Sequence, residues 1–150
     1  MQGEGDERFK ALMHDFVKNH FASPASTEDF KAAVEKHITP GMDLDGNGKM
    51  DWFFNEFVYG TEIPKYEFTY NVVNDANGAA LDLKLTQSGV SDNFKMLVPI
   101  YLETSSGGIG RLGVVPMRGN TTMAQKVPLG KMPAPKRLLI NYYYDVLSGN

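Results

Sequence analysis

The chain contains no cysteine. Disulfide bonds and thiolate metal sites are therefore excluded, and cysteine usage says nothing about the redox compartment. The chain also has no cluster of basic residues. It contains 15 lysines and arginines and 18 acidic residues, so its formal net charge is −3. Without a basic patch or a basic-aromatic alternation, nucleic acid is not expected as a partner.

Long apolar runs are missing as well. No stretch is long enough to cross a bilayer, and the first ten residues, MQGEGDERFK, lack the apolar core of a signal peptide. We therefore expect no membrane span. The sequence does not indicate the cellular compartment, and export of a longer protein that contains this chain is left open. With 42% hydrophobic and 22% charged residues among 150, the composition is that of a folded domain or two small lobes.

Helical periodicity dominates the first sixty residues. Ser26 stands three residues before Asp29, the spacing of a capping box, and predicts the start of a second helix. Pro40 and Gly41 end that helix. Before it, apolar residues recur every three or four positions and predict a first helix over about residues 7–21: Phe9, Leu12, Met13, Phe16, Val17 and Phe21.

A third helix is expected over Trp52–Tyr59. It is apolar on nearly all sides, since only Asn55 and Glu56 are hydrophilic. Asp51 precedes it in the position of an N-cap, and Gly60 follows as a natural stop. A helix without a polar face is buried between two layers, so we expect this one to form the seam between two lobes.

After Pro64 the hydrophobic pattern has period two, which is typical of strands. Six strands separated by glycine-rich turn signals are predicted: 66–72, 81–85, 96–104, 110–117, 121–128 and 137–144. We expect Tyr142, Tyr143 and Tyr144 to alternate across the last strand, which would prevent a shared stacking platform. Short strands at this spacing favour an antiparallel, Ig-like β-sandwich. The sequence thus predicts an α+β fold, with three helices in residues 1–60 and the β-sandwich in residues 61–150.

The most chemically suggestive stretch lies between the second and third helices. Its sequence, DLDGNGKMD, matches the front of an EF-hand calcium loop. The candidate ligands would offer side-chain oxygens and, at the lysine, a backbone carbonyl: Asp43, Asp45, Asn47, Lys49 and Asp51. The twelfth loop position, where an EF-hand has a bidentate glutamate, is Phe54. Two interpretations stay open, a Ca²⁺ site and a polar turn without metal.

No catalytic constellation is recognisable in the chain. The histidines, His14, His20 and His37, lack the H-E-x-x-H spacing of zinc peptidases and are interpreted as partly exposed helix residues. The serines do not stand in a G-x-S-x-G motif. The glycine-rich stretch 107–110 is interpreted as a hairpin turn, because no Lys-Ser/Thr pair follows it. We therefore predict no catalytic residue here.

One stretch carries a family resemblance. Residues 51–70, DWFFNEFVYGTEIPKYEFTY, resemble the junction of the aminopeptidase N family of zinc metallopeptidases (gluzincins), where an aromatic segment closes the helical part of the catalytic domain and a β-sandwich begins. Upstream, STEDFKAAVEKHI is similar to the helix before that junction, and downstream Gln87 and Pro99 stand in similar strand positions. The resemblance covers nearly the whole chain. The matching junction residues are Phe53, Phe54, Phe57, Val58, Gly60, Pro64 and Tyr66.

The resemblance implies that the chain is a non-catalytic C-terminal fragment of such a hydrolase, bracing the catalytic domain and its substrate cleft. The zinc ligands would precede residue 1, so zinc belongs to the parent chain only. The implied partners are the missing catalytic domain and, through the parent aminopeptidase, peptide substrates. Phe57 and Glu62 depart from the family, which often has tryptophan and glycine there. The alternative is a free-standing, calcium-stabilised β-sandwich module for binding or adaptor functions.

Overall fold

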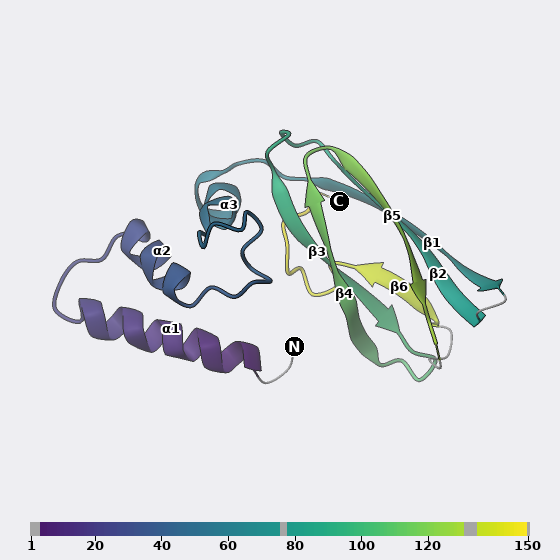
Figure 1. Cartoon of the computed structure of the whole chain (residues 1–150), viewed down its shortest axis with the longest axis horizontal. Helices are drawn as coiled ribbons and strands as arrows, with labels where there is room; N and C mark the ends of the chain where they lie inside the picture. Colours follow the sequence, from purple (N-terminus) through teal and green to yellow (C-terminus); the bar gives the residue numbers. More distant parts are fainter. Residues whose placement is uncertain (1–3, 76–77, 131–134, 150) are drawn as a thin grey trace. The chain divides into compact units, whose positions relative to one another are not determined.

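The computed structural model describes residues 4–75, 78–130 and 135–149. The chain divides into two compact units, Met1–Gly60 and Thr61–Asn150. In the described part, the first unit holds the helices and the second holds six strands in two antiparallel sheets (Figure 1). This order confirms the predicted α+β fold, with N-terminal helices followed by a sandwich-like pair of sheets.

The first unit begins with α1 (Glu4–His20) and α2 (Thr27–Lys36). The capping box at the start of α2 is confirmed, since Asp29 N–H donates to Ser26 Oγ at 3.2 Å and Ser26 N–H donates to the Asp29 carboxylate at 2.8 Å. These bonds from Ser26 lower the pKa of Asp29. The two helices meet through the edge-to-face rings of Phe16 and Phe30, whose centroids lie 5.1 Å apart.

The third helical segment differs from the single α-helix that was predicted. It consists of one α-turn, α3 (Asp51–Phe54), followed by one π-turn, η1 (Asn55–Tyr59). The Asn55 N–H is shared between the carbonyls of Asp51 and Trp52, which is where the two geometries join. The prediction of Asp51 as N-cap is wrong, because Met50 takes that position without a side-chain cap bond and the Asp51 carboxylate pairs with Lys31.

Burial along this segment is uneven. Trp52 and Phe54 are buried, whereas Val58 and Tyr59 are exposed. At Gly60 a Cβ atom would stand 2.4 Å from the Asn55 carbonyl oxygen, a distance that real side chains do not tolerate. Glycine is therefore required where the π-turn ends. The proposed role of the segment as a seam between two lobes stays a prediction.

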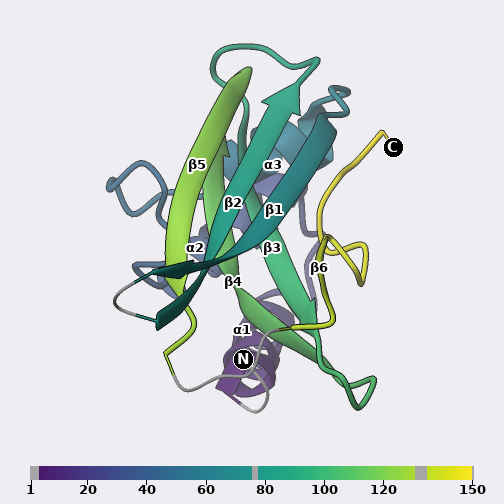
Figure 2. The same ribbon diagram turned by 90° about the vertical axis from the view of Figure 1, so that its right-hand side faces the viewer.

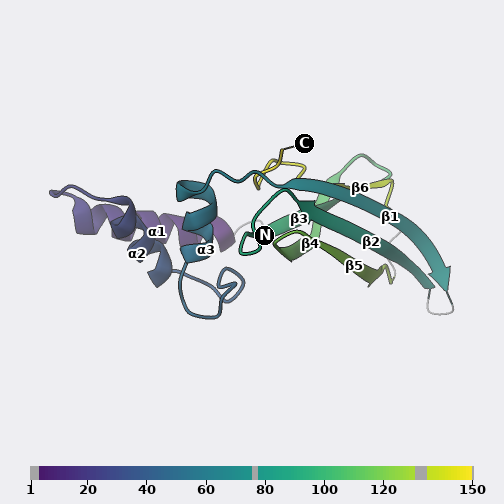
Figure 3. The same ribbon diagram turned by 90° about the horizontal axis from the view of Figure 1, so that it is seen from above.

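The second unit contains two three-stranded sheets. The first has the order β1-β2-β5 and the second β4-β3-β6, with all neighbours antiparallel. Figure 2 looks through the first sheet onto the second, and Figure 3 shows β1, β2 and β5 side by side. The strands are β1 (Lys65–Asp75), β2 (Gly78–Ser88), β3 (Lys95–Glu103), β4 (Ile109–Arg118), β5 (Thr121–Pro128) and β6 (Arg137–Ile140).

The core of this unit lies on the two central strands. Alternate residues of β2 and of β3 are buried because their side chains point to one face of each sheet, and in β3 Pro99 and Tyr101 are buried as well. The outer strand β5 is largely exposed on both faces. The buried alternating residues are Leu81, Leu83, Leu85, Met96, Val98 and Ile100.

The last strand is shorter than predicted. β6 ends at Ile140, and Asn141 and Tyr144 take positive φ angles of 48° and 58°. The Asn141 side chain exchanges two hydrogen bonds with the Val146 backbone, at 2.9 and 3.0 Å. Asparagine tolerates this conformation and stabilises the turn locally, so the chain leaves the sheet there. The expected alternation of residues 142–144 across a strand is therefore wrong.

A buried carboxylate fastens β3 to the start of β6. Glu103 accepts hydrogen bonds from the Lys136 ammonium at 2.7 Å and from the Arg137 guanidinium. Lys136 N–H also donates to the Glu103 carbonyl at 2.8 Å. The hydrogen bond from Lys136, followed by that from Arg137, lowers the pKa of Glu103 below its ordinary value.

Trp52 is expected to be a major contributor to the stability of the first unit. Its side chain is 7% exposed, and its indole N–H donates to the Met42 carbonyl at 2.8 Å. Trp52→Ala should lower the free energy of unfolding by about 3–5 kcal/mol. Trp52→Phe keeps a ring and loses the indole hydrogen bond, so it should cost about 1–2 kcal/mol.

Denaturant melts followed by circular dichroism measure both values. The chain has one tryptophan, so the fluorescence of the unmodified protein reports on this site alone. A Trp52→Ala protein that melts together with the unmodified chain would contradict the assigned burial.

Glu103 should make the stability of the second unit depend on pH. Because its pKa is lowered in the folded state, its contribution is present above the ordinary value of 4.5 and is lost as pH falls through the folded pKa. Glu103→Gln should therefore melt lower than the unmodified chain at neutral pH, and the gap should narrow in acid. Melting temperatures of both proteins over a pH series measure this difference. A difference that does not change with pH would contradict the ion pairs assigned to Glu103.

Candidate functional site

The loop between α2 and α3 contains four of the candidate calcium ligands and is closed by its own side chains. The Asp43 carboxylate accepts hydrogen bonds from the backbone N–H groups of Asn47, at 3.0 Å, and Gly48, at 2.9 Å. Asn47 Oδ1 accepts from Lys49 N–H at 2.9 Å. Gly46 and Gly48 have φ angles of 66° and 70°, which glycine adopts without strain. Asp43 and Asn47 thus lie in one compact turn.

The other candidate ligands face other partners. The Asp51 carboxylate pairs with the Lys31 ammonium on α2, and the Lys49 ammonium pairs with Glu35 at 2.8 Å. Asp45 is exposed. Within residues 4–75, 78–130 and 135–149, no group of three or more His, Cys, Asp or Glu side chains is arranged as a metal site. Calcium ligation by the five residues stays a proposal.

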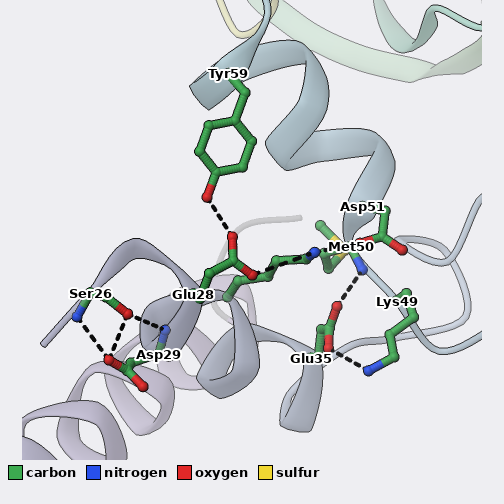
Figure 4. Close-up of polar contacts among 9 residues, drawn as sticks. Ser26, Glu28, Asp29, Glu35, Lys49, Met50, Asp51 and Tyr59 are labelled. Atoms are coloured by element: carbon green, nitrogen blue, oxygen red, sulfur yellow. Dashed lines mark hydrogen bonds and ion pairs between the residues drawn. The ribbon is translucent and has the colours of Figure 1, made fainter.

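Polar side chains of α2 bind residues of the third helical segment (Figure 4). Tyr59 O–H donates to Glu28 Oε1 at 2.6 Å, and Lys31 lies between Glu28 Oε2, at 3.9 Å, and Asp51. The hydrogen bond to Asp51 raises the pKa of Lys31, and the hydrogen bond to Glu28 raises the pKa of Tyr59. Both ends of the segment are therefore held to the same helix.

Glu35 is the second anchor on α2, and sequence analysis missed it. Its Oε1 accepts from the backbone N–H of Met50 at 3.1 Å, and its Oε2 binds the Lys49 ammonium (Figure 4). Partial burial raises the pKa of Glu35, but the bonds from Lys49 and Met50 outweigh it, and the net pKa lies below its ordinary value. Glu35 thus satisfies a backbone donor at the start of α3 that lacks a local cap.

The histidines do not converge. His20 Nδ1 lies 3.1 Å from the Phe16 carbonyl oxygen on its own helix, and His37 Nε2 lies 2.9 Å from Asp15 Oδ2. His14 is exposed. The His37–Asp15 contact joins the end of α2 to α1, so its role in this arrangement is to hold two helices together.

A second candidate site is an aromatic cluster in the second unit. Tyr101 is buried beneath Tyr142 and Tyr143, with ring centroids 6.2 and 5.3 Å away, and its hydroxyl donates to Asp145. Burial, reinforced by Asp145, raises the pKa of Tyr101 to about 12. Tyr142 and Tyr143 pack edge-to-face at 4.8 Å, which leaves no opening between their rings for a ligand.

The turn therefore displays aromatic surface outward. Tyr144 is 89% exposed and Tyr143 is 59% exposed. The hydrophobic pattern does not predict this cluster, because it continues the strand through residue 144. The signal that could have found it was Asn141, a residue that favours turns.

Comparison with known proteins gives no match to a family model, a curated protein or a solved structure. Within the described residues, no helix is both long enough and apolar enough to span a membrane.

Calcium binding by the loop has a direct test. Even weak binding, at about 10⁻⁴–10⁻³ M, should raise the melting temperature in millimolar CaCl₂ relative to EDTA, since the ion would bind the folded loop better than the unfolded chain. The Asp43→Ala/Asp45→Ala variant should lose this rise. Magnesium at the same concentration controls for ionic strength, and a melting temperature unchanged by calcium would leave the loop a metal-free turn.

Proposed function

We propose that this chain is the non-catalytic C-terminal part of an aminopeptidase-N-like zinc metallopeptidase, where it braces the catalytic domain and its substrate cleft. The observation that carries the proposal is the junction segment. Its residues close a helical unit at Gly60 and open the first strand of a sheet at Lys65. The resemblance implies this change of architecture at the same place in the chain.

Individual junction residues support the proposal. Gly60 ends the π-turn where no side chain fits, and Pro64 is buried while its carbonyl accepts from Gly149 N–H at 2.9 Å. Tyr66 is buried on β1. Glu62, which replaces the glycine often found in the family, accepts from both the backbone N–H and the hydroxyl of Ser91 at 3.0 Å. The departure at this position therefore has a structural role of its own.

A bracing role also agrees with the chemistry of the polar groups. The carboxylates of Glu28, Glu35 and Asp51 are engaged by ammonium, hydroxyl or backbone N–H donors. Groups used in this way hold the helices and the loop together. In the parent enzyme, zinc would supply the activated water of peptide hydrolysis. The residues of this chain would position the domain that contains it.

The exposed tyrosines favour a second candidate, a free-standing module that binds peptides or glycans and is stabilised by calcium. Aromatic side chains with a polar tip are common at recognition surfaces. The two candidates differ in what should precede Met1 in the natural gene, since only the first requires a catalytic segment.

The proposal predicts that the purified chain hydrolyses no aminoacyl-nitroanilide and retains no stoichiometric zinc after dialysis, because the resemblance places every zinc ligand outside it. Metal analysis and a chromogenic assay measure both. Turnover by pure protein that a chelator abolishes would contradict the proposal.

The natural reading frame gives an independent measurement. Transcript sequencing should find an H-E-x-x-H segment encoded upstream of Met1 in the same frame. A natural frame without that segment would favour the free-standing module.

A further inference from the structure

The loop at residues 43–49 contains an asparagine-glycine pair, Asn47–Gly48, and both residues are exposed. In such a pair the backbone nitrogen of the glycine can attack the side-chain amide carbon of the asparagine, because no Cβ on the glycine obstructs the approach. The new C–N bond closes a succinimide ring, and the amide leaves as ammonia. Water then opens the ring to aspartate or isoaspartate.

The attacking nitrogen is restrained in this structure. Gly48 N–H donates to Asp43 Oδ2 at 2.9 Å, and the N–H of Asn47 donates to the other oxygen of the same carboxylate at 3.0 Å. To react, the Gly48 nitrogen must turn toward the Asn47 side chain and lose the proton that it shares with Asp43. A charge-assisted hydrogen bond opposes that rotation.

The electrophile is held as well, but in a way that favours reaction. Asn47 Oδ1 accepts from Lys49 N–H at 2.9 Å. Negative charge develops on this oxygen when the amide carbon is attacked, and an oriented N–H donor stabilises such charge. The Gly48 nitrogen is thus held by a hydrogen bond that opposes the reaction, whereas the Asn47 amide is held by one that favours it.

We propose that Asn47 is a deamidation site and that the Asp43 carboxylate slows its deamidation in the folded protein. Each event consumes one water, releases one ammonia and adds one carboxylate, which takes the formal net charge from −3 to −4. The aspartate product turns D-x-D-x-N at 43–47 into D-x-D-x-D, and the isoaspartate product adds a methylene to the backbone. This inference does not depend on the proposed function.

The test follows deamidation in the intact chain by tryptic mass mapping. Lys36 and Lys49 bound the peptide 37–49, in which Asn47 is the sole amide side chain of the unmodified chain, and the chain's other Asn-Gly pair, at residues 77–78, falls in the peptide 66–84. In Asp43→Asn, residue 43 is a second amide in this peptide, and fragment ions assign the mass change to residue 47. The two sites are therefore measured separately. The unmodified chain is incubated at mildly alkaline pH beside Asp43→Ala, Asp43→Asn and Asp45→Ala. Asp45→Ala is the matched control, since it removes the same charge from the same loop.

Asp43→Ala should deamidate at Asn47 about tenfold faster than the unmodified chain, the change expected when one charge-assisted hydrogen bond on the nucleophile is lost. Asp43→Asn keeps a neutral acceptor and should be intermediate, whereas Asp45→Ala should behave as the unmodified chain does. In guanidinium chloride all four rates should coincide, because the loop no longer exists.

Three outcomes would overturn the proposal. Asp43→Ala could react at the unmodified rate. It could also react more slowly, which would mean that the carboxylate acts as a base and accelerates deamidation. The folded unmodified chain could also react as fast as the unfolded one. Circular dichroism checks the fold of each variant. If Asp43→Ala fails to fold, the comparison of Asp43→Asn with Asp45→Ala decides, because equal rates there also overturn the proposal.

Discussion

The structure depends on carboxylates that accept hydrogen bonds from backbone N–H groups outside regular secondary structure. Asp29 does this at the start of α2, Glu35 at the start of α3, Asp43 within the loop between them, and Glu62 at Ser91 in the second unit. A backbone donor away from water is costly without a partner, which applies to the part-buried Met50 N–H that Glu35 binds. The other three contacts are exposed, and all four connect a carboxylate to the chain at a place where it changes direction.

The parts of this scheme that are local could be predicted from the sequence. Ser26 and Asp29 are three residues apart, and the period-two pattern of β2 marks its buried face. The Glu35–Met50 and Glu62–Ser91 contacts join residues 15 and 29 positions apart, and no spacing rule connects them. The loop lies between these cases. Its sequence predicts either a cation site or a polar turn, and the side chains of Asp43 and Asn47 accept hydrogen bonds from the loop's own backbone N–H groups, while calcium binding stays a prediction.

Two elements differ from their predictions where the backbone departs from regular geometry. The aromatic residues predict one continuous third helix, whereas α3 ends at Phe54 and Asn55–Tyr59 form a π-turn. The last strand was read through residue 144 from its tyrosines, yet Asn141 turns the chain out of the sheet. Hydrophobic patterns report which side chains are apolar, and they do not report such local changes in backbone conformation and hydrogen bonding.

The junction segment shows which residues of the family resemblance are explained by the chain itself. Phe54, Pro64 and Tyr66 are buried, and Gly60 is required by the Asn55 carbonyl, so burial and sterics account for these residue types. Val58 is different, because it is 46% exposed, and burial does not account for an apolar residue there. An exposed apolar residue gains a packing role when another surface covers it. On the proposed function, that surface would belong to the catalytic domain that this segment braces.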